Sequence, residues 1–425
     1  MKKIKKIVGV LMLGASLTFL PIAHAEIKTY DGIGEYIMSD FETPDIAKQR
    51  AKVRAEQNAV EQAGVYVKSY TKIVNHVVTT DEVMAIANNI IKIVDERYTI
   101  TPNNDTGGSF RVNVAIKVVI DSDKIDNWLN RERQYNYELI EQNIKLQKDR
   151  DALDKEVTLL RKQLSKGNNE DKNILKKSLE ISDRNFLSLQ KLEEGNRLFE
   201  EKKYIESIDL CSQAIGLNEQ NADAYASRGR AYGMQYNYKQ AMSDFSKAID
   251  IDSNAAIAYN GRGLIYVELG NYNQGVADLY KAISINPQYA MPHNNLAIAF
   301  GKQGDYKKAM EELNKAIEID PRLSIAYSNR GNVYNDLGDY EKAIVELNKA
   351  ISIDAYNYKA YTIRGIVYGK IGQYQKAIDN FDKAISINNR FAAAYHFRGY
   401  VNEILGNKIQ ANKDYLMADS LENNG

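Results

Sequence analysis

The side chains that most often carry chemistry are few and widely scattered in this sequence. It has one cysteine, Cys211, and four histidines, His24, His76, His293 and His396. None of these five residues lies at metal-ligand spacing from another, such as the short cysteine and histidine intervals of zinc sites. We therefore predict no metal site and no cofactor.

Other catalytic patterns are also missing. Gly32 and Gly34 form a Gly-x-Gly, but no third glycine follows and both lie in a predicted strand, so a phosphate-binding loop is not indicated. The sequence has no serine-centred elbow, no lysine-containing phosphate loop and no calcium loop. Many carboxylates recur with a fixed period, which indicates structure. We predict that the chain is not an enzyme; a hydrolase activity within residues 26–122 is the alternative.

The N-terminus has the features of a secretory signal peptide. Lys2, Lys3, Lys5 and Lys6 precede the apolar run 7–20, and Ala23 and Ala25 supply the small residues of a cleavage site. The run is shorter than the roughly 20 residues of a spanning helix, and no second run of that length follows. Residues 1–25 are predicted to be removed, which leaves an exported, periplasmic or extracellular chain with no transmembrane segment.

The overall charge gives no reason to expect nucleic acid as a partner. The 56 basic residues are balanced by 56 acidic ones, so the formal net charge is zero. A protein that binds nucleic acid nonspecifically needs an excess of positive charge to neutralise phosphates. We therefore predict no nucleic-acid partner.

A period of 34 residues dominates the C-terminal half. It is marked by small residues at one site: Gly195, Gly229, Gly263, Ala297, Gly331, Gly365 and Gly399. A second site holds alanine: Ala214, Ala248, Ala282, Ala316, Ala350, Ala384 and Ala418. A third is mostly aromatic: Tyr232, Tyr266, Phe300, Tyr334 and Tyr368. Fixed periods of this length are typical of repeat architectures.

This pattern resembles the tetratricopeptide repeat. The resemblance covers residues 188–425 with about seven units, which start near residues 188, 222, 256, 290, 324, 358 and 392. It implies helix pairs that stack into an α-solenoid and leave a concave inner wall for a protein or peptide partner. Gly270, Gly304, Gly338, Gly372 and Gly406 are expected to end the first helix of their units in left-handed geometry.

A charged pair also follows the period. Arg228, Arg262, Arg330 and Arg398 lie sixteen residues before Asp244, Asp278, Glu346 and Asp414. In an antiparallel helix pair this spacing can bring the two side chains together. Because it recurs, we interpret it as architectural. Two units depart from it, with Arg364 before Asn380 and Leu296 before Glu312.

The family's geometry assigns partner binding to variable positions of the first helices. These positions are Asn260, Asn294, Ser328, Asn332, Asn335, Thr362, His396 and Tyr400. They are mostly uncharged hydrogen-bonding groups, which suits an extended peptide or a partner helix. Simple solvation of the inner wall is the alternative. The lysine and asparagine set with which the family clamps chaperone tails is not assembled.

Residues 26–122 are predicted to form a small α+β domain. We expect strands at 27–38, 91–101 and 110–121, helices at 45–64 and 81–91, and an extended segment at 65–78. Ala47, Ala51, Ala55, Ala59 and Ala63 form a stripe at four-residue spacing that can lie tightly on a sheet. The domain resembles the N-terminal domain of flagellar ring assembly protein T and related surface lipoproteins, which implies a role in envelope assembly.

Residues 123–172 are predicted to form one long helix, to about residue 166, followed by a hinge. Heptad spacing marks an apolar seam made of Leu129, Leu139, Leu146, Leu153, Val157, Leu160 and Leu164. Such a seam favours a coiled coil and a homo-oligomer. A helix packed on its own chain is the alternative.

The combined prediction is a mainly α protein that serves as an exported scaffold or adaptor of the bacterial cell envelope. A second hypothesis resembles periplasmic coordinators that join a coiled coil to such repeats and link wall synthesis to constriction. The α+β domain argues against it, because those coordinators begin directly with the coiled coil.

Overall fold

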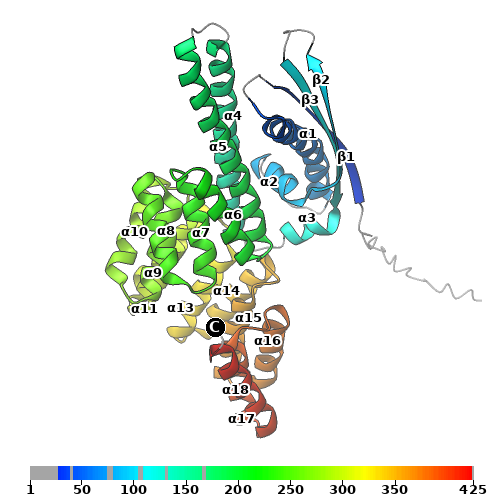
Figure 1. Ribbon diagram of the computed structural model, residues 1–425. Helices are drawn as coiled ribbons and strands as arrows, with labels where there is room; N and C mark the ends of the chain where they lie inside the picture. Colours follow the sequence, from blue (N-terminus) through cyan, green and yellow to red (C-terminus); the bar gives the residue numbers. More distant parts are fainter. Residues whose placement is uncertain are drawn as a thin grey trace, which may run out of the picture.

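The computed structural model describes residues 27–38, 42–73, 80–103, 109–129, 133–164 and 169–423. A small α+β domain, a hairpin of two long helices and an array of helix pairs follow one another along the chain (Figure 1). The mainly α class predicted from the sequence is confirmed. The predicted signal peptide, with Ala23 and Ala25, lies outside the described residues.

The sheet of the α+β domain has three antiparallel strands. They are β1 (Ile27–Met38), β2 (Lys92–Asn103) and β3 (Ser109–Asp121), in the order β1-β3-β2. The alternating residues of β3 all face the domain core and are buried: Val112, Val114, Ile116, Val118 and Ile120. This is the arrangement expected when one sheet face is covered.

The alanine stripe brings α1 (Pro44–Ile73) close to the sheet. All five of its predicted alanines are fully buried. On β1, a methyl group added at Gly32 would overlap the carbonyl of Ala55, and one at Gly34 would overlap that of Ala51. Small residues on both elements therefore permit a close helix–sheet contact.

The extended segment predicted after this helix is wrong over residues 65–73, because α1 continues to Ile73. Val67 and Thr71 extend the stripe at the same four-residue spacing, and both are buried. Packing of this face overrides the β preference of the valines. Residues 74–79 lie outside the description, and α2 (Thr80–Ile90) follows with Ile86 in the domain core.

The single long helix predicted after the sheet is divided in two. α3 (Ser122–Leu129) belongs to the α+β domain, where its Ile125 is fully buried. α4 (Arg133–Leu164) then forms an antiparallel hairpin with α5 (Asn169–Glu200) (Figure 1). Leu129 ends α3, so it cannot continue the seam of α4. The predicted hinge lies partly outside the described residues, at 165–168.

The seam predicted for self-association is covered by the chain itself. Val157, Leu160 and Leu164 are buried with Leu179 of α5, and Leu146 is buried with Leu192 of α5. Leu153 packs partly buried in the same cluster as Leu146. The described residues of this seam therefore give no support to the predicted homo-oligomer, because they pack against α5 of the same chain, as in the alternative of a helix packed on its own chain. The side chains of Leu129 and Leu139 are not described.

The array follows the 34-residue period. The end of α5 pairs with α6 (Tyr204–Leu217). The remaining pairs are α7 (Ala222–Met234) with α8 (Tyr238–Ile251), α9 (Ala256–Glu268) with α10 (Tyr272–Ile285), α11 (Ala290–Lys302) with α12 (Tyr306–Ile319), α13 (Ser324–Asp336) with α14 (Tyr340–Ile353), α15 (Tyr358–Lys370) with α16 (Tyr374–Ile387), and α17 (Ala392–Ile404) with α18 (Lys408–Asn423). The five glycines between paired helices have φ of 75 to 80°, as predicted.

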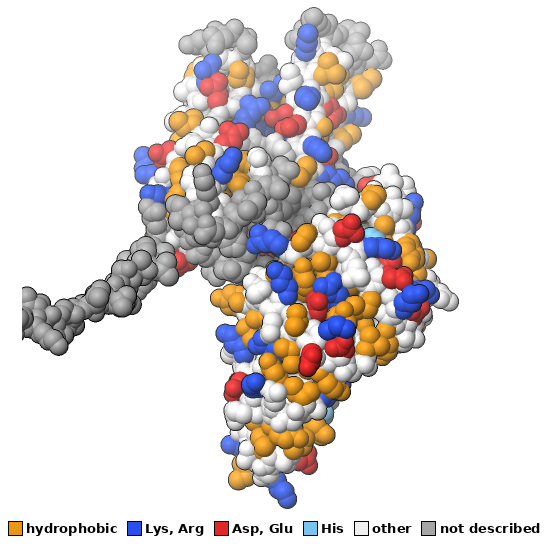
Figure 2. All heavy atoms as spheres, turned by 180° about the vertical axis from the view of Figure 1, so that it is seen from behind, with side chains coloured by type: hydrophobic (Ala, Val, Ile, Leu, Met, Phe, Trp, Pro, Cys, Tyr) orange, Lys and Arg blue, Asp and Glu red, His pale blue; other side chains and the backbone are white. Residues whose placement is uncertain are grey.

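Figure 2 shows one face of the array. Its hydrophobic side chains gather in small patches between lysines, arginines, aspartates and glutamates.

A partly buried ionic cluster connects the α+β domain to the helical hairpin. Arg50 of α1 donates to Asp154 of α4 (3.1 Å) and Asp183 of α5 (2.9 Å). Nearby, Arg161 of α4 contacts Glu42, which also accepts a hydrogen bond from the hydroxyl of Tyr36 (2.6 Å). The α+β domain is therefore held to both helices of the hairpin, and α1 lies between the sheet and the hairpin (Figure 1).

The same interface should make stability depend on pH. The pKa of Glu56 in α1 is raised to about 7, mainly by burial and also by the nearby Glu193 of α5, while Lys52 and Arg150 oppose the shift. A pKa above the ordinary 4.5 means that the folded chain binds this proton more tightly. The resulting stabilisation is complete below about pH 4.5 and is lost as the pH rises through about 7.

We therefore expect the free energy of unfolding to fall by at most about 3 kcal/mol over this range. The variant Glu56→Gln should flatten the fall, measured by urea denaturation at several pH values. Glu61→Gln, an exposed position on the same helix, is the control. An unchanged slope in Glu56→Gln would assign the pH dependence to other groups.

Candidate functional site

The recurring charged pairs are structural, as predicted. Arg228 binds Asp244 through two hydrogen bonds of 2.8 Å, and the other three pairs show the same kind of contact. Each arginine also contacts the second helix of the preceding unit, for example Arg228 with Ser212 (3.0 Å). The arginines therefore connect neighbouring units, a role that the sixteen-residue spacing did not reveal.

In the two units that lack the charged pair, the remaining polar side chain finds another hydrogen-bond partner. Arg364 donates to the Asn380 side-chain carbonyl (2.8 Å). Glu312, which has no arginine opposite, is held by His293 (2.6 Å) and Lys315 (2.8 Å). Burial acts to raise the pKa of Glu312, but these hydrogen bonds outweigh it and lower the pKa. His293 is thus a structural residue.

A chain of amide hydrogen bonds joins successive first helices. Asn260 of α9 donates to the Tyr289 hydroxyl (3.0 Å) and accepts from Asn295 of α11 (2.9 Å). Asn294 donates to Asn295 (3.3 Å) and accepts from Asn329 of α13 (2.8 Å). We call this chain the amide ladder, and the side of the first helices that carries it the inner face.

The ladder changes the interpretation of the predicted binding residues. Five of them are buried: Asn260, Asn294, Ser328, Asn335 and Thr362. Asn294 is 0% exposed, so its amide serves the ladder and is not accessible to a partner. Buried amides of this kind are normally satisfied within the protein.

The remaining three predicted residues are accessible and lie on α13 and α17. Asn332 is half-buried, His396 is exposed, and Tyr400 is 56% exposed. Asn332, Ile366 and Tyr400 share one repeat position on the successive helices α13, α15 and α17. Ile366 is partly buried against a core cluster of α16 and α17, so the three residues form a partly accessible row with an amide, an aliphatic and an aromatic side chain. Sequence reasoning missed Ile366 because it selected hydrogen-bonding residues only.

At the other end of the array, α4 lies on the inner face. Lys145 of α4 binds Asp223 of α7 (2.7 Å) and lies 3.8 Å from Asp252, and Gln142 donates to Ser227 of α7 (3.4 Å). Ser227 has the repeat position of Asn295, so α4 covers the face that carries the ladder further along. One feature of the sequence could have indicated this contact. Asp223 is acidic at the repeat position where Ile257, Met291 and Ile325 are apolar.

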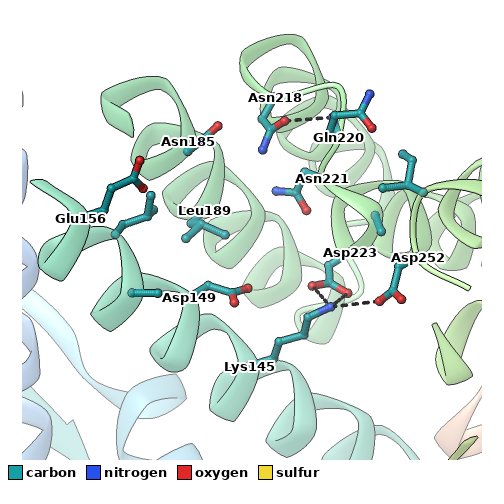
Figure 3. Close-up of a pocket in the computed structure, with 14 residues that line it drawn as sticks. Lys145, Asp149, Glu156, Asn185, Leu189, Asn218, Gln220, Asn221, Asp223 and Asp252 are labelled. Atoms are coloured by element: carbon teal, nitrogen blue, oxygen red, sulfur yellow. Dashed lines mark hydrogen bonds and ion pairs between the residues drawn. The ribbon is translucent and has the colours of Figure 1, made fainter. Parts of the chain in front are cut away.

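A cleft of about 400 Å³ opens beside this contact, between α4, α5 and the turns after α6 and α8 (Figure 3). Leu153 and Leu189 supply apolar lining, and the polar lining includes Asp149, Glu156, Asp223, Asp252 and Lys145. Burial raises the pKa of Asp149, which Lys145 opposes and Asp223 reinforces. The cleft is acidic, and the positively charged group that pairs with its carboxylates is Lys145 of the same chain.

Within the described residues, no group of three or more histidine, cysteine, aspartate or glutamate side chains could hold a metal ion. In the same part of the chain, no helix combines the length and the apolar character needed to cross a lipid bilayer. Cys211 is fully buried, and burial raises the pKa of its thiol to about 12.

Family models identify the repeats. A model described as TPR repeat matches residues 263–304, 299–338 and 331–372, and two described as tetratricopeptide repeat match residues 358–391 and 222–254. The chain therefore contains tetratricopeptide repeats, as the sequence predicted. Repeats of this class generally serve as non-enzymatic scaffolds for protein interactions.

Three solved structures with related repeats match this chain over nearly their full length. YrrB, "a TPR protein with an unusual peptide-binding site", is 24% identical, over 44% of this chain and 96% of that chain, with a TM-score of 0.31. A tetratricopeptide repeat protein from Parabacteroides merdae is 20% identical, over 63% and 99%, with a TM-score of 0.44. MamA is 26% identical, over 38% and 95%, with a TM-score of 0.32. No curated protein matches the chain.

Proposed function

We propose that this chain is an exported scaffold of the bacterial cell envelope that holds a protein segment on the inner face of α13, α15 and α17. The row of Asn332, Ile366 and Tyr400 carries this proposal, because it runs across three neighbouring first helices. Arg330, Arg364 and Arg398 tie these helices to the second helices of their own units. An amide, an aliphatic and an aromatic side chain in line can bind both the backbone and the apolar side chains of a peptide.

Export is supported by the residues of the predicted signal peptide, and envelope assembly by the resemblance of the α+β domain. Lys2 to Lys6, the apolar run and Ala23 and Ala25 have the order that secretion requires. We assign no catalysis to the chain. N-terminal sequencing of the protein from fractionated cells should find a mature chain that begins near Glu26, and an intact Met1 in the cytoplasm would contradict export.

The binding face can be tested by crosslinking in intact cells. Photoreactive residues at Asn332 and Tyr400 should capture the same partner. Val345, which is 63% exposed on the second helix α14, is the control position. Capture of a protein at Val345, with none at Asn332 and Tyr400, would assign binding to the other side of the array.

A further inference from the structure

The helix α4 occupies the first part of the inner face in the manner of a bound partner helix. Leu146 is buried in one cluster with Leu189 and Leu192 of the first unit, and Leu153 lies against the same cluster. Beside this apolar seam, Lys145 projects to Asp223, while Asp252 lies close by (Figure 3). The contact therefore combines a leucine stripe with two ion pairs, Lys145 with Asp223 of α7 and Arg150 with Glu193 of α5.

The fit of α4 to the repeats leaves polar atoms unpaired. The side-chain oxygen of Gln142 and the side-chain nitrogen of Asn196 in α5 are buried without a hydrogen-bond partner in the described part of the chain. The one hydrogen bond from Gln142, to Ser227, is long at 3.4 Å. Buried polar groups are normally paired, so this packing leaves room for a better-matched occupant.

The opposite side of α4 is bound by the α+β domain. Arg54 of α1 donates to Asp154 (3.4 Å), and Gln57 donates to Gln147 (3.1 Å). α4 is thus shared between the two modules. A change that moves α4 on one side must alter its contacts on the other, which is the physical requirement for coupling two sites.

We propose that the inner face of α5 and α7 is a second binding site, for an amphipathic helix with a lysine beside a leucine seam, and that α4 is its resident occupant. A partner helix of this chemistry would displace α4, place its lysine against Asp223 and Asp252, and loosen the α+β domain. The proposal rests on the proposed function, that the repeats hold protein segments, and it adds the class of segment and the regulation of access.

The probe is a labelled peptide with the sequence of residues 142–157, which contains Lys145, Leu146 and Leu153. We expect weak binding to the unaltered full chain, because α4 keeps the site mostly filled. The full-chain variant Leu146→Ala, which weakens the resident helix, should bind the peptide about tenfold more tightly or better. Lys148→Ala, at an exposed position on α4, is the matched control and should bind like the unaltered chain.

A charge exchange tests the receptor. Adding Asp223→Lys to the Leu146→Ala chain should abolish binding of the peptide, and a peptide with Lys145→Asp should restore it. Displacement can also be measured directly in the unaltered chain. At a high concentration of the original peptide, hydrogen exchange in α4 should become faster. Equal affinity of Leu146→Ala and the unaltered chain, or binding that ignores Asp223→Lys, would overturn the proposal. Either result leaves the crosslinking test at Asn332 and Tyr400 independent.

Discussion

Replacing Arg50 with methionine should lower the free energy of unfolding of the full chain by about 3–5 kcal/mol. Arg50 is 1% exposed and binds Asp154 and Asp183 from two different helices. Its guanidinium also lies over the ring of Phe186, 4.6 Å from the centroid. Burial raises the pKa of Asp183, and Arg50 opposes that shift, so removal of the arginine leaves a partly buried carboxylate without its main partner.

Urea denaturation followed by circular dichroism measures this effect. The double variant Arg50→Met with Asp183→Leu should recover part of the loss, because it removes the stranded charge together with its partner. Lys302→Met is the control, since the Lys302–Glu268 pair is exposed and such pairs contribute about 0–1 kcal/mol. A loss as small as that of the control would mean that the ionic cluster does not hold the two modules together.

Replacing Phe245 with alanine should lower the free energy of unfolding by about 3–5 kcal/mol. Phe245 of α8 is 2% exposed, and its ring fills the space left by two glycines of the neighbouring first helices, Gly229 and Gly261. A methyl group at Gly261 would overlap this ring. Alanine therefore leaves a cavity between two units that no neighbouring side chain is shaped to fill.

Because each unit of a repeat array contacts mainly its neighbours, the damage should be local. Hydrogen exchange should become faster in α7 to α10 and stay unchanged in β1 and β3. Val345→Ala, an exposed position on another second helix, should change stability by no more than about 0.5 kcal/mol. Uniformly faster exchange along the whole chain would instead show that the array and the α+β domain unfold as one unit.

The short-range features of the fold were predictable because their signals lie close together in the sequence. The 34-residue period, the left-handed glycines and the charged pairs all describe contacts within one unit or between neighbours. The alternation of β3 and the alanine stripe of α1 are equally local. The stripe even continued through Val67 and Thr71, and only the β preference of the valines concealed the full length of the helix.

The candidate site was predicted only in part, because accessibility depends on neighbouring units. The sequence indicated which positions face inward, including Asn294 and Tyr400. It gave no means of telling which of the two is accessible to a partner. In the structure, Asn294 is enclosed by amides from α11 and α13, whereas Tyr400 remains exposed. Which inward position stays free is settled by the side chain that arrives from the next helix.

The sequence by itself determined the repeats, their register and the apolar seam of α4. Only the tertiary structure decided what covers that seam, because a leucine stripe has the same pattern whether α5 or a second copy lies against it. It also decided that Arg50 meets Asp154 and Asp183, which lie 104 and 133 residues further along the chain. No periodicity links residues so far apart, so their contact follows from how the finished modules pack.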